Sequence, residues 1–120
     1  MRMLLRGMLS LVALLALLLA GPVWILASNQ VVTNAHWSSL DRSSAGIAPD
    51  PAENSEAVVQ VYSARAYNWR GAFGEHIWIA TKAENADSYR LHQVLSWRRP
   101  TVVSSIDTPD RAWFGNPPHC

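Results

Sequence analysis

The pattern of hydrophobic and polar positions begins with an uninterrupted apolar run. Residues 7–27 carry no charge over 21 positions and are rich in leucine and alanine, and Arg2 and Arg6 precede them. A helix rises about 1.5 Å per residue, so this run is long enough to cross the roughly 30 Å hydrocarbon core of a bilayer. We therefore predict that residues 1–27 form a single-pass transmembrane anchor or a signal peptide.

The charges that flank this run predict an orientation. Positive flanks stay in the cytoplasm, so the helix should lie in the inner (cytoplasmic) membrane with the rest of the chain extracytoplasmic, in the periplasm. Ile25 stands where a signal-peptide cleavage site normally has a small residue. This favours an uncleaved anchor, with the cleaved signal peptide as the alternative.

The next stretch, residues 28–57, changes character. Ser, Asn, Asp, Ala and Pro dominate it, and its apolar side chains are scattered. Such a composition favours an extended segment. We predict an extracytoplasmic linker arm that joins the membrane segment to a folded domain and packs on it in part through Val31, Trp37 and Ile47.

Short β-branched and aromatic runs follow, separated by turn residues. They predict strands at residues 58–66, 75–82, 89–98 and 101–106. The short connections between them favour an antiparallel meander. The predicted fold class is α+β: an N-terminal transmembrane or signal helix, then a small antiparallel sheet of about four strands within a domain at residues 58–120.

The second predicted strand is apolar on both faces. His76, Trp78 and Ala80 point one way, and Ile77 and Ile79 point the other. Such a strand should be central and covered on both sides, because buried apolar surface contributes roughly 25 cal/mol per Å². The remaining chain does not look able to cover two faces. We expect an incomplete domain, the N-terminal part of a longer one, or a partner or membrane surface that supplies the second cover.

Composition narrows the classes of protein. A chain of 120 residues holds one domain at most. Beyond Arg2 and Arg6, eight basic and nine acidic residues remain, so the body is nearly neutral and no nucleic-acid partner is expected. The only cysteine is Cys120, which excludes an intramolecular disulfide. The spacing of histidine and cysteine predicts no metal site, and no cofactor motif is present.

One histidine is a candidate for chemistry. His76 lies on the second predicted strand, and imidazole titrates near pH 6.5, which suits a general base. The alternative is a buried, hydrogen-bonded strand histidine beside Trp78. Neighbouring Glu75 points to the opposite face and is a poor orienting group. Cys120 as a nucleophile for His76 is disfavoured, because it follows Pro117, Pro118 and His119 instead of standing at the start of a helix.

Arginine and aromatic residues alternate along the domain and suggest a binding surface. We predict ligand contacts from Trp69, Arg70 and Arg98, which would stack on sugars or hold a carboxylate such as that of a peptidoglycan stem. The alternative is structural: arginines lie across aromatic edges and pair with Asp107 and Asp110. The wider set is Arg65, Arg70, Arg98, Arg99 and Arg111, interleaved with Trp69, Trp97, Trp113 and Phe114.

Several motifs resemble a known family. They are DRSSAGIAPDP at 41–51, VVQVYSARAYNWRGAFGEHIWIATK at 58–82, the pair Trp97–Arg98 and DTPDRAWFGNPP at 107–118. Together they resemble a bacterial family catalogued as domain of unknown function 3750. The resemblance implies an N-terminal membrane segment, a longer chain and no assigned activity.

A weaker resemblance concerns the surroundings of His76. A strand histidine in a His-x-Trp-Ile context is similar to circularly permuted papain-like cell-wall hydrolases, in which it would be the base. The matching nucleophile segment has no counterpart here, so the sequence does not decide whether the chain is an enzyme. We expect an uncharacterised membrane-anchored extracytoplasmic protein, either a fragment of a papain-like envelope hydrolase or a non-catalytic envelope binding or structural module. The expected partners are the membrane and either peptidoglycan or an envelope protein.

Overall fold

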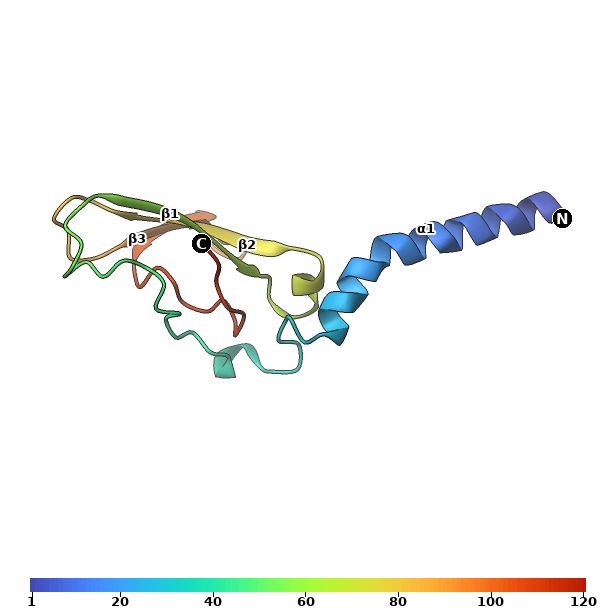
Figure 1. Cartoon of the computed structure of the whole chain (residues 1–120), viewed down its shortest axis with the longest axis horizontal. Coiled ribbons are helices and arrows are strands. Elements are labelled where there is room, and N and C mark those ends of the chain that lie inside the picture. The colour runs from blue at the N-terminus through green and yellow to red at the C-terminus, as the bar shows by residue number, and fades with distance from the viewer.

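The computed structural model describes all residues, 1–120, as one long helix followed by a small sheet with coil beneath it (Figure 1). The α+β fold class predicted from the sequence is confirmed. The regular elements are α1 (Arg2–Ala27), β1 (Val58–Arg65), β2 (Glu75–Lys82), β3 (Arg90–Val94) and β4 (Val102–Ile106), with two short 3-10 helices, η1 (Trp37–Ser39) and η2 (Asn68–Ala72).

Helix α1 projects away from the rest of the molecule and buries none of its residues. It is long and apolar enough to cross a membrane. Pro22 lies inside the helix, which continues to Ala27. The helix ends where the Ser28 hydroxyl donates to the Trp24 carbonyl over 2.6 Å. Apart from its C-terminal end, which lies near η2, the helix is free of the rest of the chain. A helix that is apolar on all sides over most of its length and buries none of its residues is suited to lipid rather than water.

The four strands form an antiparallel meander in the order β1-β2-β3-β4, as the short connections predict. In the register of the sheet, Trp78 of β2 lies opposite Tyr62 of β1 on one side and opposite Gln93 of β3 on the other. On the opposite face Ile79 stands next to Val61. Successive side chains alternate between the faces of a strand, so each strand contributes to both.

The third strand is shorter than its alternation suggests, because it ends at Val94 rather than at Arg98. Leu95 N–H donates to the Thr101 carbonyl over 2.8 Å and closes the turn into β4. The chain must reverse here so that Val94 can pair with Val102. The alternation of apolar and polar residues therefore continues past Val94, where the hairpin ends the strand.

One face of the sheet is covered by coil. The arm of residues 28–57 and the tail of residues 107–120 both run beneath the strands (Figure 1). Of the arm residues expected to pack, Val31 is buried, whereas Trp37 and Ile47 are about half exposed. Val31 lies against Gly71, where a Cβ would overlap its side chain.

Two buried polar side chains hold this coil in place. The Asp110 carboxylate accepts from Ser44 Oγ at 2.6 Å and from the backbone N–H groups of Ile47 at 2.7 Å and Ala48 at 3.0 Å. Asn116 accepts from Val32 N–H at 2.9 Å and donates to the Arg65 carbonyl at 3.0 Å. Backbone polar groups of coil need such partners when they are buried.

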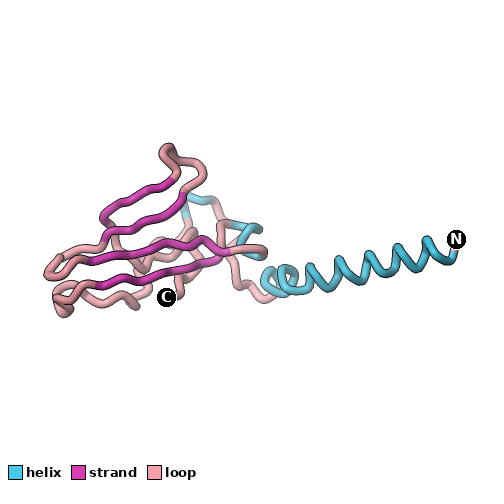
Figure 2. The backbone as a smooth tube through the Cα atoms, turned by 90° about the horizontal axis from the view of Figure 1, so that it is seen from above, coloured by secondary structure: helices cyan, strands magenta, loops and turns pink.

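The hydrophobic core lies between the sheet and this coil. Tyr62, Ala64, Trp78, Ala80, Tyr89 and Leu91 form it. As the sequence indicates, the chain by itself does not cover both faces of β2. Ile77 is 60% and Ile79 42% exposed, although β2 is central. The arm and the tail pair with each other, so both cover the same face and leave the other bare (Figure 2).

Candidate functional site

A groove of about 850 Å³ opens on the covered side of the sheet. Its floor is formed by residues near the start of β2 and the end of β3, and its walls by the turn after β3 and by the tail. Aromatic rings dominate the lining: Trp37, Tyr67, Trp78, Trp97, Trp113 and Phe114. Ligand sites are typically concave and mostly apolar with a few convergent polar groups, and this groove fits that description.

His76 is a polar group of the groove, and its ring contacts two indoles. It stacks on Trp113, with the centroids 3.8 Å apart and the planes 18° apart. It also lies near Trp78, with the centroids 5.7 Å apart, and the two indoles are themselves neighbours at 6.3 Å. Its Nε2 lies 2.8 Å from Oε1 of Gln93 on the neighbouring strand. Three contacts therefore fix the position of the imidazole.

The surroundings of His76 keep it neutral. Burial lowers the pKa of His76 below its ordinary value, and the hydrogen bond to Gln93 opposes this only in part. With a carbonyl oxygen as its partner, Nε2 carries the proton and donates, which leaves a lone pair on Nδ1. Every buried side-chain nitrogen and oxygen in the chain has a hydrogen-bond partner. No protein group bonds to Nδ1, so that atom is not fully buried.

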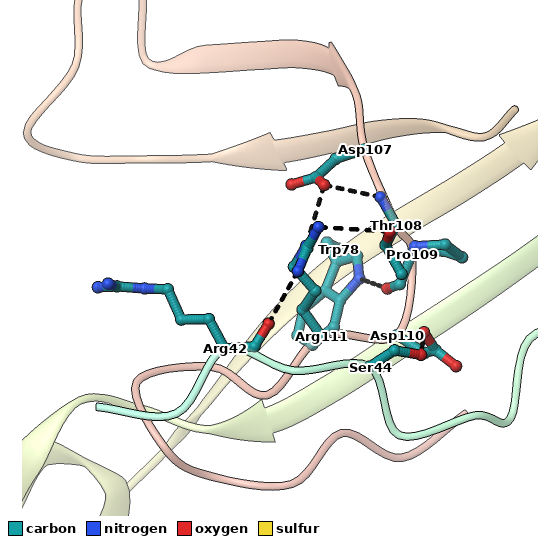
Figure 3. Close-up of polar contacts among 8 residues, drawn as sticks. All are labelled: Arg42, Ser44, Trp78, Asp107, Thr108, Pro109, Asp110 and Arg111. Carbon is teal, nitrogen blue, oxygen red and sulfur yellow. Dashed lines mark hydrogen bonds and ion pairs between the residues drawn. The ribbon is translucent and has the colours of Figure 1, made fainter. Parts of the chain in front are cut away.

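The segment that carries Trp113 is fixed by its own hydrogen bonds. Trp78 Nε1–H donates to the Pro109 carbonyl over 2.7 Å (Figure 3). Trp113 and Asn116 exchange two backbone bonds of 2.9 Å each across a tight turn. Phe114 and Gly115 occupy this turn with positive φ of 45° and 84°, and glycine adopts the second at little cost. The turn thus presents Trp113 to His76.

Arginines border the groove on its tail side. Arg111 Nε donates to Asp107 Oδ1 over 3.0 Å, and its Nη1 donates to the Arg42 carbonyl over 3.1 Å (Figure 3). The guanidinium of Arg42 lies 4.9 Å from the centre of the Phe114 ring. The Arg111–Asp107 pair matches the structural alternative considered for these residues. Asp110 has no arginine partner, contrary to that expectation, because neutral donors of the arm occupy its oxygens.

The structure places the sequence-predicted site residues in two different locations. His76 and Arg70 line the groove. Trp69, which is 56% exposed, and Arg98 do not line it. The Arg70 guanidinium lies over the Trp69 ring at 5.0 Å. Only part of the predicted binding set therefore faces the groove.

Gln93 is the groove residue that sequence reasoning missed. It stands directly opposite Trp78 in the antiparallel register. A fixed register between β2 and β3 would have identified it as a neighbour of the β2 side chains. Tyr67 was also missed, although its ring lies 4.8 Å from that of Phe114.

No cluster of three or more His, Cys, Asp or Glu side chains in the chain could hold a metal ion. Cys120 is exposed and does not line the groove. The acidic groups of the lining are Glu75 and Asp107, and each stands close to an arginine.

These features define a small α+β protein with an apolar N-terminal helix and an aromatic groove. Residues 56–120 match the family model described as "Protein of unknown function (DUF3750)", and the chain belongs to this family. The match covers all four strands and the tail that carries Trp113. No curated protein matches the chain, and no solved structure does.

Proposed function

We propose that this protein is a membrane-anchored module that binds a carbohydrate-containing ligand of the cell envelope in its aromatic groove. The observation that carries the proposal is the cluster of rings formed by Trp78, His76, Trp113 and Trp97. Trp113 lies at its centre, with its ring centroid 3.8 Å from that of His76, 6.3 Å from Trp78 and 6.1 Å from Trp97. The Trp97 side chain is 62% exposed and free to meet a ligand.

The chemistry of the groove suits a sugar better than a purely apolar molecule. Indole faces offer large, rigid surfaces on which the C–H face of a sugar ring can lie. His76 Nδ1 can accept a hydrogen bond from a ligand hydroxyl. Arg70 lines the rim, where a guanidinium can hold a ligand carboxylate. A peptidoglycan fragment carries sugar rings, hydroxyls and carboxylates together.

The proposed location follows from the N-terminal helix. Arg2 and Arg6 lie in the first turns of α1, before its uncharged run, so we place the N-terminus in the cytoplasm and the groove on the other side of the inner membrane, in the periplasm. A phosphatase reporter fused after Cys120 should be active, because that enzyme requires export. Activity of a cytoplasmic reporter at the same position would contradict this orientation.

The binding proposal is tested with the full chain in detergent and soluble peptidoglycan fragments. Trp97→Ala should weaken binding about tenfold, the loss expected for a stacked aromatic contact of ~1.4 kcal/mol. Phe73→Ala is the control, because the aromatic side chain of Phe73 is similarly exposed but lies outside the groove. Tryptophan fluorescence during titration reports the affinity. Equal losses in the two variants, or no binding by the unmodified protein, would refute the proposal.

A second candidate is hydrolysis of an envelope polymer with His76 as the general base. The observation that favours it is the free Nδ1 lone pair on an imidazole that is neutral at pH 7. Under this alternative, His76→Gln should abolish release of soluble fragments from peptidoglycan and leave the thermal midpoint within a few degrees. An unmodified protein that binds the fragments without cleaving them would exclude it.

A further inference from the structure

The corner of the domain next to the end of α1 carries an exposed aromatic pair. Trp69 lies in η2 and Phe73 directly follows it, and their side chains are 56% and 61% exposed. The two rings meet edge to face, with their centroids 6.1 Å apart. Neither ring lines the groove or belongs to the hydrophobic core. We call this pair the η2 corner, and its exposure needs another explanation.

The η2 corner is tied to the end of α1 by a short stretch of chain. The helix ends at Ala27, whereas Val31 is already buried against Gly71 of η2. Four residues of fully extended chain span at most about 14 Å. Beyond this point Val32 N–H donates to the Asn116 side chain and holds the arm on the domain. The η2 corner therefore stays close to the end of α1, whatever angle the helix takes.

This position sets the level of the η2 corner relative to a membrane. The helix η2 (yellow-green in Figure 1) lies beside the C-terminal end of α1, and the two are in contact. When α1 crosses a bilayer, η2 therefore stands at the surface where the helix emerges. Trp24, in the last turn of α1, is 67% exposed at the same end. Tryptophan is enriched at this level of membrane proteins, because its amphipathic ring suits the headgroup layer.

We propose that the η2 corner is a second membrane contact, in which Trp69 and Phe73 insert among the lipid headgroups beside α1. The proposal rests on the insertion of α1 in a membrane. The partner is the bilayer surface, because the short link from Ala27 to Val31 already holds the corner there. Removal of two exposed rings from water favours the docked position.

The charges around the η2 corner predict that docking depends on the rings more than on lipid charge. Arg65 is paired with Glu75 at 3.9 Å. Arg70 lies over the Trp69 ring at 5.0 Å and has no acidic partner. Strong attraction to anionic lipid requires a cluster of basic residues, and a single free arginine does not provide one. Docking should therefore be similar on phosphatidylcholine and on phosphatidylglycerol.

Docking would also orient the groove. Tyr67 and Arg70 flank Trp69 in the chain, and both line the groove. One end of the groove therefore lies directly behind the η2 corner. With the corner held at the bilayer, this end of the groove stands close to the membrane surface.

The first experiment measures the depth of a spin label on the full chain in phosphatidylcholine vesicles, in a Cys120→Ser background. Gly74→Cys carries the label beside the η2 corner and leaves both rings in place, because a Cβ at Gly74 meets no other atom within 4 Å. Glu84→Cys is the control, since Glu84 is exposed just beyond the other end of β2. Oxygen concentrates in lipid and a nickel chelate stays in water, so the ratio of their collisions with the label reports depth.

The collision ratio should be several-fold higher at residue 74 than at residue 84, and similar when the vesicles contain phosphatidylglycerol. Equal ratios at the two positions, in protein that floats with the vesicles, would refute the docking and leave the anchor intact. Protein that does not float with the vesicles would refute the anchor and the docking together. Binding of soluble ligands in the groove is measured in detergent, so its failure is recognised separately.

The second experiment removes the rings and keeps the label at residue 74. Trp69→Ser combined with Phe73→Ser should lower the collision ratio to near that of residue 84, because no apolar side chain then holds the corner among the headgroups. Val59→Ser is the control and should leave the ratio unchanged, since Val59 is 73% exposed near the other end of β1. Circular dichroism checks the fold. A ratio that survives the double substitution would overturn the proposal, because the short link alone would then account for it.

Discussion

The two faces of the sheet use alternate residues of the same strands, and both combine apolar with polar side chains. Beneath the sheet, β1 and β2 present Gln60 and the buried Lys82 beside their aromatic residues. On the open side the same strands present Val59, Val61 and Ile79. Apolar character alone therefore does not decide which face the chain covers.

The difference arises from what the cover is made of. The arm and the tail are coil, and coil carries backbone carbonyls and N–H groups that must find partners when buried. The covered face supplies side-chain donors for them. Lys82 Nζ donates to the Glu56 carbonyl over 2.5 Å, and Tyr89 Oη donates to the Pro49 carbonyl over 2.7 Å. On the open face, His92, Thr81 and Ser104 bond to one another, and the aliphatic side chains between the strand ends offer no donors to a coil cover.

The largest expected effect is at the centre of the covered face. Trp78 is 4% exposed, stacks on Tyr62 and donates to the Pro109 carbonyl. Trp78→Ala should lower the free energy of unfolding by about 4 kcal/mol, through the cavity and the lost hydrogen bond. Urea unfolding of the full chain in detergent measures it. Trp78→Phe keeps most of the packing, so its free energy of unfolding should fall much less. Equal losses of unfolding free energy in the two variants would show that the hydrogen bond dominates.

The next effect concerns the attachment of the coil. Asp110→Ala leaves the donors of Ser44, Ile47 and Ala48 without their acceptor beneath the sheet. We expect a loss of about 3 kcal/mol, typical of a broken buried network around a charge. Asp110→Asn keeps one acceptor oxygen and should lose less than half of that. A loss below that of an exposed control, Asp87→Ala, would contradict the role assigned to Asp110.

Acid should act through the same carboxyl group. Burial alone would raise the pKa of Asp110, but the bonds from Ser44, Ala48 and Ile47 hold it below its usual value. The contribution of Asp110 to stability is therefore fully present above its pKa in the unfolded chain, about 3.9. It is lost as the pH falls through the lower pKa that Asp110 has in the folded protein. Thermal midpoints at pH 7 and pH 3 should differ less for Asp110→Asn than for the unmodified protein. Asp41, whose pKa is also lowered by the Ser43 N–H, accounts for some residual acid sensitivity.

The contrast between the faces also explains what the sequence could reveal. Helix α1, the four strands and their antiparallel order follow from local patterns, and these were predicted correctly. The identity of the covered face depends on contacts such as Ser44 with Asp110 and Val32 with Asn116, which join residues far apart in the chain. No local periodicity encodes those contacts.

The candidate site divides in the same way. His76 lies on a regular strand, so alternation placed its side chain on the same face as Trp78. Trp69 and Arg98 lie in η2 and in the turn after β3, where strand alternation does not hold, and neither lines the groove. The groove also depends on the tail, because the turn at Phe114 and Gly115 brings Trp113 against His76. Such a meeting of distant segments requires the tertiary fold.

The smallest expected effect tests the open face, with a matched pair on β1. Val61→Thr keeps the β-branched shape and changes only the polarity of a side chain that is 54% exposed. In a monomer diluted in detergent it should change the free energy of unfolding by less than about 0.5 kcal/mol. Val58→Thr makes the same change where Val58 packs against the core, and should lose about 1 kcal/mol because a hydroxyl is buried.

Urea unfolding of both variants at increasing dilution separates the faces further. The Val58→Thr loss should not depend on protein concentration, because its contacts lie within one chain. A Val61→Thr loss that appears only when the protein is concentrated would mean that the open face becomes buried between copies. A Val61→Thr loss above about 1 kcal/mol at every dilution would instead require a cover from within the same chain, and would contradict the contrast between the two faces.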